Sequence, residues 1–270
     1  MQYKSVLTAL VLFAGASNLS HAAMEGGIGV EHFDWKEFDG SGSQLLKEFG
    51  PRLALNFNWT QDKKDDKGLL FGYRGKAYGG TVRYNGATFG GTPVVTDTEY
   101  LGMSHEGQAI FRYDYARGKL DYVIGLGWDN WRRSIRNDAL NLNQIEDYNI
   151  YYLRLGASYD HPGKSGLHGG AGIKHTFYAT EDAHLNDLGY RQNPTINPGK
   201  SLTAYAELGY RLSNTKWDLV GYYDSYTFSA SDPVTTQTSL GSNVQLYQPK
   251  SEMKLLGFKA VFLALAALAL

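Results

Sequence analysis

The sequence predicts an all-β fold, an antiparallel up-and-down transmembrane β-barrel of about ten strands with both termini in the periplasm. Three observations lead to this fold class. Segments of about ten residues alternate between apolar and polar side chains, aromatic residues gather at the ends of these segments, and the connections alternate between short and long. A soluble antiparallel sheet can also have one polar face, so the aromatic ends and the connections decide between the two.

The clearest unit is the stretch from Ser201 to Phe228, which contains a complete hairpin. Apolar and polar residues alternate on both sides of the short polar turn Ser213–Lys216. A period of two gives each strand one apolar and one polar face. The rest of the mature chain repeats this unit.

The composition argues against a nucleic-acid-binding protein and against a disulfide-stabilised one. The chain has 270 residues, a formal net charge of -1 and no cysteine. It therefore offers no basic surface for nucleic acid and no disulfide framework. Its mean hydropathy of -0.36 is typical of a soluble protein, but barrel strands turn polar residues inward and dilute this signal.

Residues 1–22 are predicted to form a signal peptide. Lys4 supplies the positive n-region, Val6–Ala16 the apolar core, and Ser20–Ala22 a small-x-small cleavage site. We expect cleavage after Ala22 or Ala23, followed by export. The alternative, an N-terminal membrane anchor, is disfavoured because the apolar run is shorter than the roughly 18 residues that span a bilayer.

The mature chain, residues 23–262, is predicted to be one barrel domain. In each predicted strand the side chains alternate between the two faces. The strands are Gly26–Trp35, Arg52–Gln61, Leu69–Tyr84, Tyr100–Tyr115, Lys119–Trp131, Tyr148–Tyr159, Leu167–Tyr178, Leu202–Leu212, Trp217–Phe228 and Met253–Phe262.

The connections between these strands alternate in length along the chain. Those after even-numbered strands are short: Asp62–Lys67, Ala116–Gly118, Asp160–Ser165 and Ser213–Lys216. Those after odd-numbered strands are long: Lys36–Gly50, Asn85–Thr98, Arg132–Asp147, Ala179–Lys200 and Ala230–Lys250. Short periplasmic turns that alternate with long outer loops are what an outer-membrane barrel requires, whereas a β-sandwich has no reason to sort its loops. The sequence therefore predicts a location in the bacterial outer membrane.

Charged residues identify the polar face as the barrel interior. A Lys or Arg that faces lipid near the bilayer midplane costs roughly 2–4 kcal/mol. The predicted interior charges are Arg74, Lys76, Arg112, Arg154, Lys174, Arg211 and Lys259, with Glu31, Asp114, Asp121, Asp129, Glu207, Asp218 and Asp224. Because the two signs match and the lumen of such a barrel is narrow, we expect salt-bridged networks to plug it, and no wide pore.

The apolar face is predicted to meet lipid. On two neighbouring strands its members are Phe111, Tyr113 and Tyr115, then Leu120, Tyr122, Ile124, Leu126 and Trp128. Tyr and Trp suit the headgroup level because each has an apolar body and a polar tip. We expect these residues to anchor the barrel and not to bind a ligand.

The last predicted strand closes on Gly257–Phe262, which looks like the terminal signal of outer-membrane barrels. Leu263–Leu270 then forms an apolar tail, residues 263–270, that is too short to span a membrane as a helix. The sequence does not explain this tail. It is either an added extension or a continuation of the strand.

Several segments resemble the omptin family of outer-membrane proteases, which are ten-stranded barrels. The resemblance is clearest in Tyr151–Tyr159, Leu167–Gly170 and Lys174–Thr176, and looser in Gln44–Trp59 and Gly257–Phe262. It covers most of the mature chain at low identity. It implies the barrel fold and an endopeptidase that requires lipopolysaccharide and cleaves near basic residues.

The resemblance also implies a catalytic site at the extracellular rim. Omptins have an Asp-x-Asp pair in the second outer loop and an Asp-x-His pair in the fourth. Here these positions hold Asp97 and Glu99, then Asp182 and His184. By resemblance, Asp182 would orient His184, which would take a proton from a water. That water would be held against Asp97 and Glu99, and this is general-base chemistry.

Two positions depart from the family pattern. Glu99 stands where omptins have Asp, and moving a catalytic group by about 1 Å can lower a rate on the order of 10²-fold. Thr180 stands where omptins have an acidic residue that selects a basic side chain, and its neighbour Glu181 would point the opposite way. We expect no metal, because Glu181, Asp182 and His184 offer too few ligands, and no cofactor besides lipopolysaccharide.

Two functions therefore stand. One is a surface endopeptidase, with lipid and lipopolysaccharide as partners and a peptide or protein substrate at the outer loops. The other is a non-catalytic barrel: a narrow channel, an adhesin or receptor, or a structural outer-membrane protein. Carboxylates that converge on His184 would favour the endopeptidase, and a continuous water path through the lumen would favour a channel.

Overall fold

The computed structural model is an all-β, closed antiparallel barrel, and it describes residues 22–61, 67–87, 91–137, 142–161, 166–213 and 215–265. The predicted antiparallel up-and-down barrel of about ten strands is confirmed, and the predicted periplasmic position of its termini stays a prediction. The predicted signal peptide, apart from Ala22, and residues 266–270 of the predicted tail lie outside the described residues. Within the described ranges, no helix has the length and apolar character to cross a membrane.

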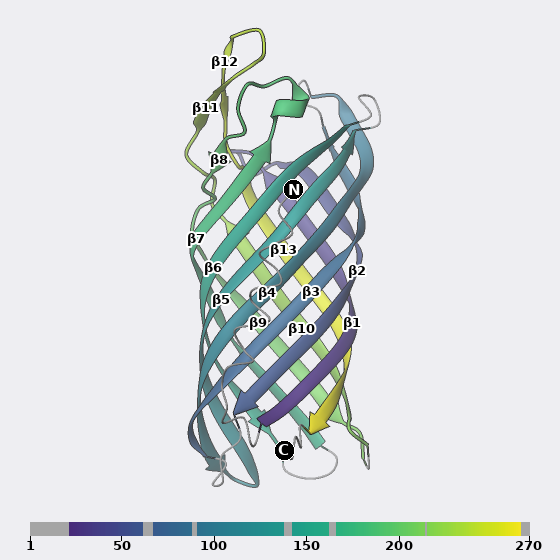
Figure 1. Ribbon diagram of the computed structural model, residues 1–270, viewed down its shortest axis with the longest axis vertical. Helices are drawn as coiled ribbons and strands as arrows, with labels where there is room; N and C mark the ends of the chain where they lie inside the picture. The colour runs from purple at the N-terminus through teal and green to yellow at the C-terminus, as the bar shows by residue number, and fades with distance from the viewer. Residues whose placement is uncertain are drawn as a thin grey trace, which may run out of the picture.

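Ten strands close the barrel in the order in which they follow one another along the chain (Figure 1). They are β1 (Ala22–Phe38), β2 (Gln44–Gln61), β3 (Gly68–Ala87), β4 (Pro93–Tyr115), β5 (Gly118–Asn137), β6 (Leu142–Asp160), β7 (Gly166–His184), β9 (Ser201–Arg211), β10 (Trp217–Phe228) and β13 (Lys250–Leu265). β13 closes the barrel against β1, and Leu263–Leu265 of the predicted tail continues this pairing. All neighbouring strands are antiparallel, as the up-and-down topology requires.

The two ends of the barrel differ. The start of β1, the end of β13 and short connections lie at one end, which we call the turn end. The opposite end, the loop end, carries η2 (Asn186–Leu188), β8 (Thr195–Ile196) and a hairpin of β11 (Val234–Gln237) and β12 (Asn243–Leu246). β8 pairs with the last part of β7, and the β11–β12 hairpin stands above the rim (Figure 1).

The strands are longer than the sequence predicts. The predicted outer loops Lys36–Gly50, Asn85–Thr98 and Arg132–Asp147 are largely strand, because β1 to β6 continue to pair beyond their predicted ends. Inward and outward residues still alternate there, but the outward residues become charged. The pattern therefore no longer looks like a membrane strand, although the hydrogen-bonded wall continues.

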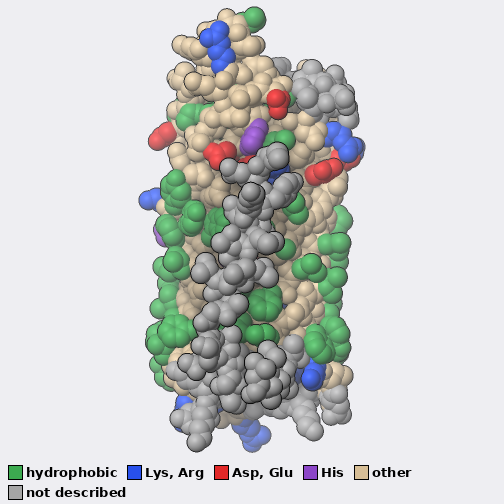
Figure 2. Space-filling model, viewed as in Figure 1, with side chains coloured by type: hydrophobic (Ala, Val, Ile, Leu, Met, Phe, Trp, Pro, Cys, Tyr) green, Lys and Arg blue, Asp and Glu red, His purple; other side chains and the backbone are tan. Residues whose placement is uncertain are grey.

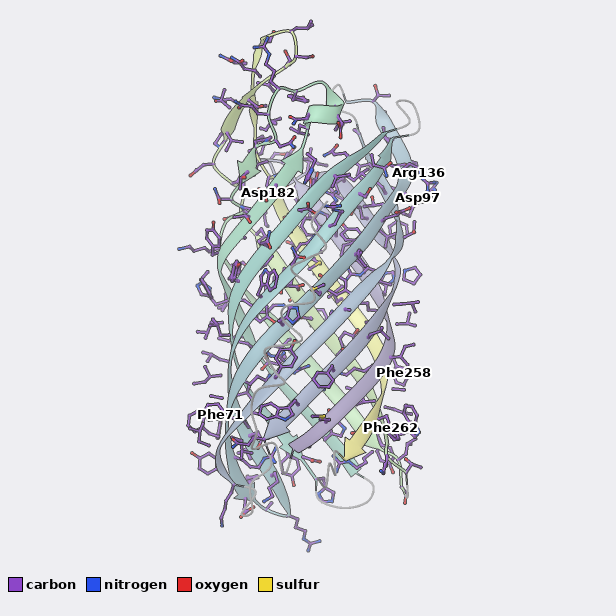
Figure 3. All side chains as sticks on the ribbon, in the orientation of Figure 1. Phe71, Asp97, Arg136, Asp182, Phe258 and Phe262 are labelled. Carbon is purple, nitrogen blue, oxygen red and sulfur yellow. The ribbon has the colours of Figure 1, made fainter. Side chains whose placement is uncertain are left out.

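The outer wall carries an apolar band. On β4 and β5 the predicted outward residues Phe111, Tyr113, Tyr115, Tyr122, Ile124 and Leu126 are between 37% and 62% exposed. Figure 3 shows Phe71, Phe258 and Phe262 on the outside of the wall. The ring centroid of Trp128 lies 6.4 Å from that of Tyr151, and the two rings stack. The prediction that these side chains point outward is confirmed.

Toward the loop end, the outer wall changes from apolar to charged. We call the outward charges there the charged collar: Asp34, Lys36, Lys47, Arg83, Asp97, Glu99, Arg132, Arg136, Asp147, Asp182 and His184. Figure 2 shows acidic, basic and His side chains near this end, above flanks where hydrophobic side chains gather. Because unpaired charge is costly in hydrocarbon, we place the collar and the strand residues beside it outside the membrane.

Ion pairs hold the turn-end part of the interior. Glu207 lies 3.0 Å from Arg74 and 3.9 Å from Lys259. Other predicted interior charges pair as Lys76–Glu31 at 3.2 Å, Arg112–Asp121 at 2.8 Å, Lys174–Asp224 at 2.6 Å, Arg211–Asp160 at 3.1 Å and Arg154–Glu106 at 3.6 Å. Asp114 differs from the prediction: its side chain is 61% exposed at the turn end, where Lys119 lies 2.7 Å away.

The ion pairs do not fill the lumen, and this corrects the prediction that they plug it. They surround two cavities of about 80 and 230 Å³. Nearer the loop end the lumen is filled by aromatic side chains that are at most 4% exposed. We call them the aromatic plug: Phe33, Trp35, Tyr78, Tyr100, Trp131, Tyr148, Tyr226 and Phe228. The wider core cluster around them draws on every barrel strand except β9.

The plug is closely packed. Trp131 stacks on Tyr148 with ring centroids 5.0 Å apart, and Trp35 packs edge-on against Tyr148 at 5.9 Å. Gly102 makes room for the rings, since a Cβ there would lie 2.6 Å from the Tyr78 ring and 2.7 Å from Trp131 Cβ. Aromatic pairs of this kind contribute about 0.5–1.5 kcal/mol each beyond their buried area. Closely packed aromatic rings therefore close the lumen at this level, with the Arg52 guanidinium over the rings of Phe33 and Tyr78.

Candidate functional site

The residues predicted to be catalytic lie on the outer wall. Asp97 and Glu99 are on β4, and Asp182 and His184 are on β7. All of them belong to the charged collar, because the residues that alternate with them are buried on the inner face. They therefore point away from the lumen, and not into a cleft at the barrel mouth.

Strands β5 and β6 separate the two predicted pairs. The register places Glu99, Ser134, Ile145 and His184 in one row across β4 to β7. At about 4.8 Å per strand, Glu99 and His184 are about 14 Å apart along the wall. A single water cannot contact both, so the structure does not bring the predicted residues together into one site.

Three of the predicted residues have other partners. Carboxylate oxygens of Asp97 and Glu99 each lie 3.9 Å from Arg136. Asp182 accepts a hydrogen bond from Thr195 Oγ1 at 2.6 Å, across the β7–β8 pairing. Figure 3 shows Asp97 beside Arg136, with Asp182 well apart from both. These contacts are those of an ion-paired and hydrogen-bonded collar.

His184 has a carboxylate partner, but it is Asp147 and not Asp182. His184 Nε2 lies 3.0 Å from Asp147 Oδ2, and Arg132 donates two hydrogen bonds of 2.8 Å to the same carboxylate. Burial alone would raise the pKa of Asp147, but the hydrogen bonds and charge of Arg132, together with His184, hold it below its ordinary value. An ionised Asp147 therefore orients the imidazole at the collar.

Inside the wall, at the same level, lies a group that the sequence analysis missed. We call it the carboxylate cluster: Glu37, Glu48, Glu146 and Glu181 around Arg133, each at most 6% exposed. Arg133 Nη1 lies 2.7 Å from Glu146 and 3.3 Å from Glu37, and Nη2 lies 2.9 Å from Glu48. One guanidinium therefore serves several carboxylates.

Neutral donors complete this cluster. Glu37 accepts a hydrogen bond of 2.9 Å from Trp35 Nε1, and Glu146 accepts one of 3.1 Å from the Tyr148 hydroxyl. Glu48 accepts hydrogen bonds from Thr98 and Tyr100, and Glu37 accepts one from Gln248. The cluster and the aromatic plug are therefore parts of one packed layer.

A sequence signal for this cluster exists in the charged doublets of the predicted loops. They are Lys36–Glu37, Lys47–Glu48, Arg132–Arg133, Glu146–Asp147 and Glu181–Asp182. In an extended strand, two consecutive charges must face opposite sides of the wall. One member of each doublet therefore enters the collar and the other enters the interior. Glu181 points inward beside the outward Thr180, as its predicted direction requires.

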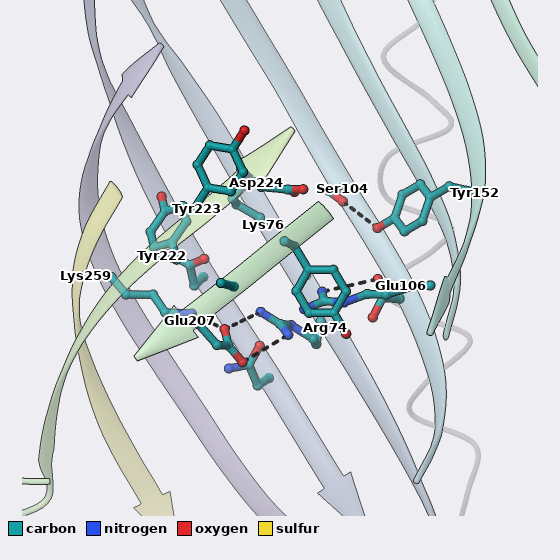
Figure 4. A pocket seen from close by; sticks show the side chains of 16 residues that line it. Arg74, Lys76, Ser104, Glu106, Tyr152, Glu207, Tyr222, Tyr223, Asp224 and Lys259 are labelled. Carbon is teal, nitrogen blue, oxygen red and sulfur yellow. Dashed lines mark hydrogen bonds and ion pairs between the residues drawn. The ribbon is translucent and has the colours of Figure 1, made fainter. Parts of the chain in front are cut away.

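The turn-end cavities form the second candidate site. The larger cavity is lined by charges of both signs, among them Arg112, Asp121 and His168. Figure 4 shows the smaller cavity, with Arg74 paired to Glu207. These charges already face partners: Arg112 lies 2.8 Å from Asp121, and His168 lies 3.0 Å from Asp218. Among the described residues, no group of three or more His, Cys, Asp or Glu side chains could hold a metal ion.

Comparison with known proteins identifies the fold. No protein-family model matches the chain, and no curated protein matches it. The outer-membrane protease OmpT of Escherichia coli is similar in structure, with a TM-score of 0.53 and 7% identity over 92% of this chain and 98% of OmpT. The transport unit of the Escherichia coli autotransporter AIDA-I has a TM-score of 0.50 and 9% identity, over 96% of this chain and 97% of that unit.

These similarities concern the fold alone, because the identities are low. They confirm the predicted structural resemblance to omptins and support the predicted outer-membrane location. A protease and a transport unit share this architecture with the present chain, so the barrel by itself does not select a function.

Proposed function

We propose that this protein is a closed, non-catalytic outer-membrane barrel, with its turn end in the periplasm and its loop end at the cell surface. The aromatic plug is the observation that carries this proposal. Trp35, Trp131, Tyr148 and Phe228 are each at most 1% exposed, and they fill the lumen between the cavities and the loop end. A layer packed to the density of a protein interior has few voids larger than a water molecule, so a solute cannot pass it without displacing side chains.

Electrical conductance tests this proposal. The purified barrel is inserted into planar lipid bilayers and compared with the double variant Trp35→Ala/Trp131→Ala. We expect no conductance steps from the parent and steps from the variant, because removing two rings opens the lumen. Trp128→Ala, which removes an outward ring, is the matched control and should behave like the parent. Steady conductance of the parent would contradict the proposal.

A receptor role is a second candidate, favoured by the β11–β12 hairpin. Its strands contain no charged residue, and Leu240 at its tip is 94% exposed. An uncharged surface of hydroxyl and amide groups suits neutral ligands such as glycans. A glycan array probed with the parent, and with a variant in which a short Gly-Ser link replaces Val234–Leu246, tests this role. Binding that is lost in the variant supports it, and no glycan bound by the parent contradicts it.

The endopeptidase implied by the omptin resemblance keeps one supporting observation, the His184–Asp147 contact at 3.0 Å. The test is cleavage of a dibasic fluorogenic peptide by the refolded barrel in detergent with lipopolysaccharide. Turnover that disappears in His184→Ala would support this function and contradict the non-catalytic proposal. A heat-dependent gel shift verifies folding, and a folded barrel without turnover would exclude cleavage of dibasic peptides.

A further inference from the structure

We propose that the carboxylate cluster is a proton-binding site, in which Glu181 holds a proton at neutral pH and locks the loop end of β7 to the strands around it. This property is separate from whether the barrel conducts or binds a ligand.

The first observation is an imbalance of buried charge. Glu37, Glu48, Glu146 and Glu181 surround a single cation, Arg133, and all are at most 6% exposed. A buried carboxylate without a partner becomes neutral by taking a proton, because the desolvation of its charge is too costly. With every carboxylate ionised, the cluster would hold a large excess of negative charge in a dry interior.

The second observation selects Glu181. Arg133 is already engaged by the other carboxylates at distances up to 3.3 Å, and Glu181 Oε2 is buried with no hydrogen-bond partner. Its place is fixed by the sheet, since Glu181 pairs with Tyr148 on β6 and with Ile196 on β8. Within the cluster, Glu181 is therefore the carboxylate that makes no ion pair with Arg133, and it is buried at the loop end of β7.

The surroundings of Glu181 agree with this assignment. The titratable and charged groups of the cluster and beside it are Glu146 and Tyr148 on β6, Glu37 on β1, Glu48 on β2, Tyr84 on β3, Tyr100 on β4 and Arg133 on β5. Burial first, and then the charges of Glu146 and Glu37, raise the pKa of Glu181 well above its ordinary value. The strand neighbour of Glu181 is Asp182 of the charged collar, so this group lies outside the membrane.

A proton fits this site better than a metal ion does. The carboxylates converge on a guanidinium, which excludes a second cation from the centre of the cluster. Among the described side chains, which include the whole cluster, no group of three or more His, Cys, Asp or Glu residues could hold a metal. The site therefore accepts a cation that needs one oxygen and almost no space.

Loss of the proton would weaken the rim. The O–H bond of Glu181 breaks, its electron pair stays on the carboxylate, and the proton leaves to solvent at the loop end. The new negative charge then faces Glu146 and Glu37. Because the folded pKa is raised, the contribution of Glu181 to stability is complete at acidic pH and is lost as the pH rises through that pKa.

Infrared spectroscopy of the full barrel tests the proposal, because a protonated carboxyl absorbs separately from a carboxylate. The parent should show protonated-carboxyl absorption at neutral pH, and part of it should be lost in Glu181→Gln. Glu99→Gln, a collar residue whose side chain is 63% exposed, is the matched control and should keep the whole band. A band that is unchanged in a folded Glu181→Gln variant would overturn the proposal.

A second variant covers the case in which Glu181→Gln does not fold. Glu37→Gln removes one negative charge that faces Glu181, so the protonated band should titrate at a lower pH than in the parent. An unchanged titration would overturn the proposal. Calcium chloride and a chelator are the ion controls: both should leave the band unchanged, and displacement of the band by calcium would show a metal site in place of a proton site.

Discussion

The two halves of the barrel interior are filled in different ways. The turn-end half pairs cations and carboxylates nearly one to one and keeps cavities of about 80 and 230 Å³ between them. The loop-end half packs aromatic rings that are almost fully buried and places a single guanidinium among several carboxylates. One half is polar and contains cavities, and the other is closely packed.

This difference shows that the contribution of an inward-facing charge to stability depends on its position along the barrel. Where cavities remain, an ion pair contributes little, because space beside it lets other groups or water replace a lost partner. Where rings exclude water, a charge without its partner is strongly unfavourable. The same kind of substitution should therefore have a large effect in the loop-end half and a small effect in the turn-end half.

The largest effect is expected from Arg133→Ala. It leaves several buried carboxylates without a cation, and breaking a buried pair costs about 3–5 kcal/mol. Its strand neighbour Arg132, 54% exposed in the collar, is the matched control, and Arg132→Ala should cost at most about 1 kcal/mol. Urea unfolding in detergent micelles measures both. Equal effects would contradict the contrast between the interior and the collar.

Trp131→Ala should cost about 3 kcal/mol, since truncation of a buried Trp leaves a cavity that the neighbouring rings fill only in part. Trp128→Ala is the control, because the Trp128 ring lies on the outer wall against Tyr151 and loses fewer contacts. The measurement is the midpoint of urea unfolding for each variant. A Trp131 variant as stable as the Trp128 variant would mean that the plug is loosely packed.

At the turn end, Arg74→Gln should cost only about 1.5–3 kcal/mol, which is the loss of a hydrogen bond between charged groups. Glu207 keeps Lys259 at 3.9 Å, and the cavity beside it gives the remaining groups room to adjust. The same unfolding assay tests this. A cost as large as that of Arg133→Ala would remove the distinction between the two halves.

The smallest effect is expected at the collar, from Asp147→Asn. The pKa of Asp147 is held below its ordinary value, so its contribution is present at neutral pH and is lost as the pH falls through the folded pKa. At neutral pH the variant should lose about 0.5 kcal/mol, and once the pH has fallen below the folded pKa of Asp147 the two proteins should be equally stable. A difference that grows on acidification would contradict this sign.

The alternation along the strands predicts most of the fold because a lipid bilayer permits few structures. A membrane-spanning chain must hydrogen-bond all of its backbone N–H and C=O groups, and each barrel strand must have an apolar face toward lipid. Beyond the apolar band this constraint disappears. The strand ends at Lys36–Glu37 and Arg132–Arg133 therefore look like loops, although the wall continues through them. The sequence predicts that a strand begins at Arg52, but the burial of Arg52 against Glu31 follows only from the β1–β2 register.

The candidate site was less predictable than the fold. The short motifs around Asp97 and His184 give the residue types, but which residues meet depends on strand register and on facing direction. The structure turns Asp97, Glu99, Asp182 and His184 outward and joins His184 to Asp147, a residue that the predicted loop concealed. The charged doublets would have indicated two faces, had these segments been recognised as strands.

Accessibility of a single cysteine tests the central claim, that the interior is sealed at the loop end, most directly. The chain has no cysteine of its own, so Ser104→Cys places one thiol beside the turn-end cavity shown in Figure 4. The experiment uses a membrane-impermeant thiol reagent on intact cells that lack general porins, with the exposed Ser239→Cys as the positive control. We predict slow labelling of Ser104→Cys in intact cells, and fast labelling after the outer membrane is broken or when Trp131→Ala is added. Fast labelling of Ser104→Cys in intact cells would contradict a barrel closed by its aromatic plug.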